Sequence, residues 1–114
     1  MAYDERLAGR IRAVLATLPV ADVVVEKKAF GGLAFLVAGN MAVSASGQGG
    51  MLVRVDPGAT EALVRQPGVE RMVMRGRAMD GWLRVSVDAI GSEAALREWV
   101  ERGAAFATAL PPKD

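Results

Sequence analysis

The chain has 114 residues, of which 52% are hydrophobic and 24% are charged, and its 14 basic and 13 acidic residues leave a formal net charge of +1. This length predicts one domain that buries roughly two thirds of its unfolded surface, and the near-neutral charge excludes a global field that attracts nucleic acid or anionic lipid. Cysteine and histidine are both absent, which excludes disulfides and removes the usual general base and the commonest metal ligand. No apolar run approaches the roughly 20 residues that span a bilayer, and acids stand where a signal peptide would be basic. We therefore expect a cytoplasmic protein with no membrane contact.

The chain is expected to begin with a helix over residues 3–18, because its apolar residues follow a helical spacing and Pro19 suits a stop. Residues 23–30 predict a strand near a sheet edge, since charges of both signs follow its valines. Gly31 and Gly32 then break the run with a turn or a bulge, where glycine enters positive φ without strain.

Two apolar runs follow and are separated by Gly39 and Asn40, a short-range signal for a two-residue hairpin turn. In that register Leu36 pairs with Val43. Because side chains alternate across a strand, the opposite face then carries polar residues on one strand and apolar residues on the other. We therefore expect an outer apolar row that a two-layer domain leaves exposed, formed by Leu33, Phe35 and Val37.

The second half of the chain predicts two more helices and three more strands. A glycine-rich hairpin loop leads into a strand over residues 51–55, and Asp56 and Pro57 favour the start of a short helix over residues 58–65. Strands are expected at residues 71–75 and 82–87, joined by a turn that contains Gly76 and Gly81, and Ser92 caps a helix over residues 93–109.

This order of elements predicts an α+β domain: a single antiparallel sheet of about five to six strands with an N-terminal helix, a short middle helix and a C-terminal helix packed on it. We assign residues 1–110 to the domain and residues 111–114 to a tail.

The richest candidate for chemistry is the arginine-rich ribbon of residues 71–84, with Trp82 in its midst. Arginines beside an exposed aromatic ring can grip phosphates and stack bases. The interpretation that we favour is an ordinary two-stranded ribbon with outward arginines and a packed tryptophan. If nucleic acid is bound, the contacts are expected from Arg54, Arg71, Arg75, Arg77, Trp82 and Arg84.

Other chemistry finds less support in the residue pattern. The thioethers of Met72, Met74 and Met79 could meet a soft metal ion, but methionines on strands are far more often core filler. Asp56 and Asp88 are explained by capping and turn roles. We assign no catalytic, cofactor-binding or metal-binding residue.

Several segments together resemble the N-terminal domain of the TfoX/Sxy family. They are Glu26-Lys27-Lys28-x-Phe30-Gly31-Gly32-Leu33-x-Phe35, Gly39-Asn40-Met41, residues 51–55, Gly76-Arg77-x-Met79-x-Gly81-Trp82 and residues 110–113. The resemblance implies a small α+β domain, often dimeric, in a family linked to regulation of bacterial competence for DNA uptake. Ala29 departs from a common methionine, Ala78-Met79-Asp80 departs from Pro-Met-Lys, and a stand-alone domain without the family's second domain is expected.

The sequence thus predicts a non-enzymatic, cytoplasmic regulatory or protein-interaction domain. We expect it to form a homodimer through Leu33, Phe35 and Val37, and to have a further protein partner that the sequence does not name. The alternative is nucleic-acid binding through the arginine-rich ribbon, and a third hypothesis is a small-molecule pocket under the turn of Phe30, Gly31 and Gly32.

Overall fold

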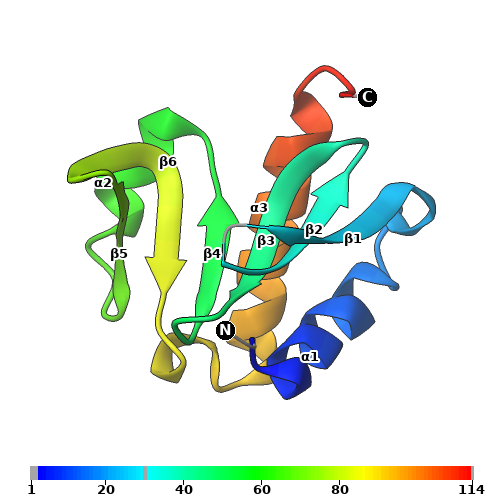
Figure 1. Ribbon diagram of the computed structural model, residues 1–114, viewed down its shortest axis with the longest axis horizontal. Coiled ribbons are helices and arrows are strands. Elements are labelled where there is room, and N and C mark those ends of the chain that lie inside the picture. Colours follow the sequence, from blue (N-terminus) through cyan, green and yellow to red (C-terminus); the bar gives the residue numbers. More distant parts are fainter. Residues whose placement is uncertain (1–2, 30, 114) are drawn as a thin grey trace.

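A six-stranded antiparallel sheet organises residues 3–29 and 31–113, which are the residues that the computed structural model describes. Its strand order is β1-β2-β3-β4-β6-β5 (Figure 1). The strands are β1 (Val24–Ala29), β2 (Gly32–Val37), β3 (Asn40–Ser46), β4 (Met51–Arg54), β5 (Val69–Met74) and β6 (Arg77–Val85). The predicted α+β class and single antiparallel sheet are confirmed.

The helices follow the predicted order with shorter bounds at two places. They are α1 (Glu5–Leu15), α2 (Thr60–Leu63) and α3 (Glu93–Ala109), with the 3-10 turns η1 (Ala21–Val23), η2 (Pro57–Ala59) and η3 (Asp88–Ile90). The predicted cap is present, because the backbone N–H of Ala95 donates to the Ser92 side chain at 3.1 Å. Within residues 3–29 and 31–113, no helix is long and apolar enough to cross a membrane.

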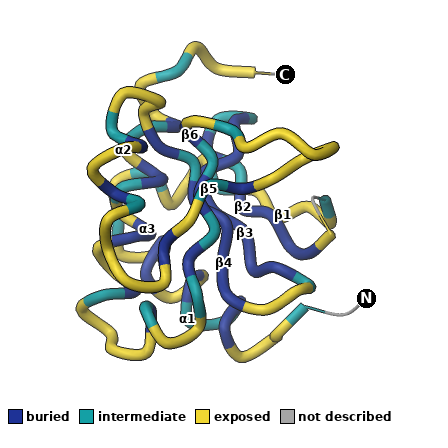
Figure 2. Tube along the Cα trace, turned by 90° about the vertical axis from the view of Figure 1, so that its left-hand side faces the viewer, coloured by how far each residue is buried: buried dark blue, intermediate teal, exposed yellow. Residues whose placement is uncertain are grey.

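Helices α1 and α3 cover one face of the sheet, and the main core lies between them and the central strands. Ile11, Phe35, Met51 and Leu83 are fully buried there, and Figure 2 shows the buried segments running through the middle of the molecule. Close contact is required at Gly103 of α3, where an added Cβ would lie 2.6 Å from the Ala42 carbonyl oxygen. The helix therefore packs directly on the backbone of β3.

The hairpin of β2 and β3 turns one residue earlier than the sequence predicts. Ala38 and Gly39 are the loop residues, with φ of 49° and 87°, and they match the two positive φ values of a tight hairpin turn. Leu36 pairs with Met41, whereas Phe35 pairs with Val43, so that Ala42 is an extra residue at a register shift. The predicted pairing of Leu36 with Val43 is wrong.

The extra residue at Ala42 changes which residues of β3 share a face with β2, because Val43 and Ala45 now lie opposite Phe35 and Leu33. Leu33 and Phe35 are 5% and 0% exposed in the main core, and Val37 is 1% exposed in a small cluster with Ala107 of α3. The expectation that these three residues form an exposed outer row is wrong, because a one-residue slip moves a strand's side chains to the other face. As a partner surface the row is inaccessible in this fold.

The opposite face of the sheet carries no helix among the described residues, and we call it the helix-free face. Ala34, Met41, Leu52 and Met72 form a small buried cluster on it, with Leu36 and Trp82 half-buried against them. These side chains cover one another because the sheet is strongly twisted, as the crossing of β1 over its neighbours shows (Figure 1).

Candidate functional site

A groove of about 770 Å³ opens on the helix-free face. It spans five neighbouring strands, since side chains from β1, β2, β3, β4 and β6 line it near the turn of the β2–β3 hairpin. Its apolar lining includes Val25, Leu36 and Trp82, whereas Met41, which also lines it, is only 4% exposed. Volumes of this size are typical of small-molecule sites.

Positive charge gathers in this groove. Lys27 of β1, Arg54 of β4 and Lys113 of the C-terminal tail line it, and no carboxylate lines it among the described residues. Lys27 belongs to this face because it pairs with Ala34, whereas its neighbour Lys28 pairs with the inward Leu33. The described lining of the groove therefore carries a net positive charge, although the whole chain is nearly neutral.

Arg54 is held over an aromatic ring. Its guanidinium carbon lies 4.7 Å from the centroid of the Trp82 ring and 5.7 Å from that of Phe106 on α3, and Arg54 and Trp82 are paired across β4 and β6. Cation–π contact of this kind orients the guanidinium and leaves its N–H groups able to donate. Arg54 is thus a positioned cation at the mouth of an apolar groove.

The tail that supplies Lys113 is tied to the hairpin turn. The backbone N–H of Lys113 donates to the Ala38 carbonyl at 2.8 Å, and the Asn40 side-chain amide donates to the Pro111 carbonyl at 2.9 Å. An added Cβ at Gly39 would lie 1.8 Å from the Lys113 carbonyl oxygen, so the close approach requires glycine there. The turn and the tail form one wall of the groove.

The six residues proposed for nucleic-acid contact fall at three separate places. Arg54, Trp82 and Arg84 lie on the helix-free face, where one Arg84 amino group donates to the Ser46 hydroxyl at 3.1 Å. Arg75 and Arg77 lie at the exposed tip of the β5–β6 hairpin. The structure therefore does not gather these residues into one patch.

Arg71, the sixth of these residues, is engaged within the chain. Its guanidinium donates to Asp80 at 2.8 Å and to Glu61 of α2. These hydrogen bonds, the one to Asp80 first, raise the pKa of Arg71. Two carboxylates compensate its charge, which leaves little attraction for a phosphate.

Strand β5 forms one edge of the sheet and pairs only with β6. Val73 and Met74 near the end of this strand are 61% and 38% exposed. An edge strand with exposed apolar side chains is a template for pairing with another strand. This edge is a second surface with binding capacity, distinct from the groove.

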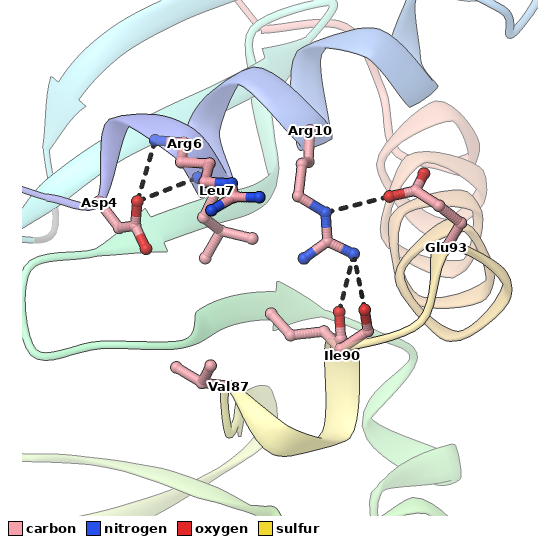
Figure 3. A pocket seen from close by; sticks show the side chains of 8 residues that line it. Asp4, Arg6, Leu7, Arg10, Val87, Ile90 and Glu93 are labelled. Carbon is pink, nitrogen blue, oxygen red and sulfur yellow. Dashed lines mark hydrogen bonds and ion pairs between the residues drawn. The ribbon is translucent and has the colours of Figure 1, made fainter.

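A further pocket of about 510 Å³ lies at the foot of α1 (Figure 3). Arg10 donates there to Glu93 at 3.1 Å and to the Ile90 and Gly91 carbonyls at 3.0 and 3.4 Å, while the Asp4 carboxylate caps α1. Arg10 thus joins α1 to the start of α3, and Asp4 is engaged as the cap of α1.

The glycine motif has structural roles at the positions that can be described. Phe30 lies outside the described residues. Gly32 packs against the backbone of β3, where an added Cβ would lie 2.0 Å from the Ala45 carbonyl oxygen. The remaining motif glycines have positive φ in turns or in strand β6, namely Gly31, Gly39, Gly76 and Gly81. Asn40, which the sequence places in the turn, is the first residue of β3.

Sequence reasoning missed six groove residues, namely Val25, Lys27, Ala29, Leu36, Met41 and Lys113. Leu36 and Met41 would have been found with the correct hairpin register, and alternation along β1 would have placed Lys27 beside them. Lys113 had no sequence signal, because only the folded tail brings it to the hairpin turn.

Comparison with known proteins gives one match. The family model described as the TfoX N-terminal domain matches residues 16–107, which is most of the chain. No match was found among curated proteins or among solved structures. In the described part of the chain, no group of three or more Asp or Glu side chains could hold a metal ion.

Proposed function

Since the chain belongs to the TfoX N-terminal domain family, we propose that it is a non-enzymatic regulatory domain that acts by binding proteins, and that a second copy of itself is one partner. The family supports a regulatory role, and the lack of histidine and cysteine supports a role without catalysis. Several of its carboxylates have structural roles, since Asp4 and Asp56 are caps and Glu26 is an ion-pair partner of Arg12.

The exposed apolar edge of β5 is the observation that carries the self-association. Pairing two β5 edges antiparallel would continue the sheet across both copies and cover Val73 and Met74. Strand addition of this kind gains main-chain hydrogen bonds along the edge. It replaces the row of Leu33, Phe35 and Val37 as the expected interface.

Twofold symmetry restricts how two β5 strands can pair. Side chains that lie opposite each other share a face of the sheet, so only residues an even number of positions apart face one another across the two copies. When two copies pair about Val73, Val73 lies opposite Val73 and Met72 lies opposite Met74 of the second copy. The exposed apolar side chains of each edge are then covered by the other copy.

Light scattering coupled to size exclusion tests the self-association at micromolar concentrations. We expect a dimer for the unchanged protein and a monomer for Val73→Lys. The matched control is Val87→Lys, because Val87 is 59% exposed but lies outside the strands, and this variant should stay dimeric. A monomeric unchanged protein at 100 micromolar would reject the dimer.

Nucleic-acid binding is the second candidate, and the shared face of Arg54, Trp82 and Arg84 favours it. Two phosphate contacts on duplex DNA, one from each arginine, predict a log–log salt slope of about −1.8. Titration with DNA at two salt concentrations, followed by tryptophan fluorescence, measures this slope. Absence of binding at low salt would end this hypothesis.

A further inference from the structure

The groove on the helix-free face is separate from the β5 edge and has its own chemistry. Lys27, Arg54 and Lys113 enter it from three elements that are distant in the sequence. A cluster of cations without a nearby carboxylate among the described lining residues costs self-repulsion in the absence of a ligand. An anion would relieve that repulsion.

The apolar part of the groove adds a second requirement. Val25 and Leu36, which are paired across β1 and β2, offer aliphatic surface beside the Trp82 ring, and Val25 is 58% exposed. An inorganic anion would leave this surface wet. A ligand that satisfies both parts must carry an apolar body as well as a negative group.

The walls of the groove favour a small ligand. The hairpin turn and the C-terminal tail close one side through the hydrogen bonds of Lys113 and Asn40, and about 770 Å³ holds a molecule of drug-like size. Arg54 is already oriented by the Trp82 ring at 4.7 Å, so little ordering is needed when a ligand binds.

We propose that this groove binds a small amphipathic anion, with its apolar body on Val25, Leu36 and Trp82 and its carboxylate or phosphate group between Arg54 and the two lysines. The binding is reversible and involves no chemical step. It adds a ligand-binding site to the regulatory domain and does not depend on self-association through β5.

Matched probes separate the two parts of the ligand. Calorimetric titration of the full chain with 1-naphthyl phosphate should detect binding, whereas 1-naphthol lacks the charge and inorganic phosphate lacks the apolar body. Both reduced probes should bind at least tenfold more weakly. Decanoate, an aliphatic carboxylate, distinguishes a general amphipathic anion from an aromatic phosphate ester.

Paired variants locate the site. Arg54→Gln should weaken the binding of 1-naphthyl phosphate roughly tenfold or more, because a charge-assisted hydrogen bond is lost. The control is Arg65→Gln, which changes an exposed arginine outside the groove. Lys27→Gln should also weaken the binding of 1-naphthyl phosphate, whereas Lys28→Gln, on the other face of β1, should leave it unchanged. Circular dichroism confirms that each variant is folded.

Three outcomes would overturn the site. They are failure of 1-naphthyl phosphate to bind at millimolar concentration, equal effects of Lys27→Gln and Lys28→Gln, and equal effects of Arg54→Gln and Arg65→Gln. Binding of a thymidine decamer that depends on Arg54, with no binding of 1-naphthyl phosphate, would instead favour single-stranded nucleic acid.

Discussion

The two tryptophans of this protein show how differently the two faces of its sheet are used. Each indole has an arginine over its ring, with Arg54 at 4.7 Å from Trp82 and Arg102 at 4.6 Å from Trp99. Trp99 of α3 is 2% exposed and packs in the main core, whereas Trp82 is half-buried and lines the groove. An arginine–tryptophan pair is therefore part of the core packing on one face of the sheet, and another such pair is part of the groove on the other face.

This contrast continues along β2, where adjacent residues have different tasks. Phe35 is buried by the helices, and Leu36 lies one residue later on the helix-free face. Burial under α1 and α3 contributes stability, and the half-open face retains surface that a ligand can cover. Substitutions on the two faces should accordingly separate stability from binding.

The largest effect is expected from Phe35→Ala. Removing a fully buried aromatic side chain should lower the free energy of unfolding by about 3–5 kcal/mol. Leu36→Ala should cost roughly half as much or less, because its side chain is only partly covered. Urea denaturation measures both, and equal losses would contradict the assignment of the faces.

A smaller effect is expected where α3 packs on the helix-covered face. Gly103→Ala places a methyl group 2.6 Å from the Ala42 carbonyl, and this overpacking should cost about 1–3 kcal/mol against a helix-propensity gain of about 1 kcal/mol. The control is Gly9→Ala in α1, where an added Cβ meets nothing within 4 Å. Gly9→Ala should be as stable as the unchanged protein or more stable in thermal unfolding. If Gly103→Ala is also more stable, α3 does not pack on β3 as closely as the 2.6 Å approach indicates.

The smallest effect concerns the ion pair that joins α1 to β1. Hydrogen bonds from Arg12 hold the pKa of Glu26 below its ordinary value. A lowered folded-state pKa stabilises the fold above the unfolded pKa of about 4.3, and this contribution is lost as the pH falls through the folded pKa. Both side chains are partly exposed, so the contribution should be under about 1 kcal/mol.

The Glu26→Gln variant measures this contribution. Its free energy of unfolding should lie below that of the unchanged protein at pH 7, and the two should converge as the pH falls to 3. A difference that stays constant over this range would show that the carboxylate does not act through its charge.

Local patterns were enough to predict most elements of the fold. The last helix was predicted with its Ser92 cap and its bounds, because capping and periodicity are local. The β2–β3 hairpin was not, since its turn is displaced by one residue and the register shift at Ala42 depends on contacts with α3 and the tail. The extra residue at Ala42, and not the displaced turn, brings Val43 and Ala45 beside Phe35 and Leu33, on the face that the helices cover.

The groove could be predicted only in part. Arg54 and Trp82 were candidates from the sequence, but they were grouped with Arg71, whose charge is compensated by Asp80 and Glu61. Ion pairs and a returning tail depend on side chains distant in sequence, and no local pattern encodes them. The proposed site could therefore be recognised only in the folded structure, although Arg54 and Trp82 were already candidates from the sequence.

The most direct measurement is a two-dimensional NMR titration of the nitrogen-labelled protein with 1-naphthyl phosphate, in which the two indole N–H signals are followed together. Trp82→Phe assigns them by removing one signal. The account predicts that the Trp82 signal shifts in a saturable manner while the Trp99 signal stays in place. Equal shifts of both signals, or a shift of the Trp99 signal alone, would contradict a binding site on the helix-free face.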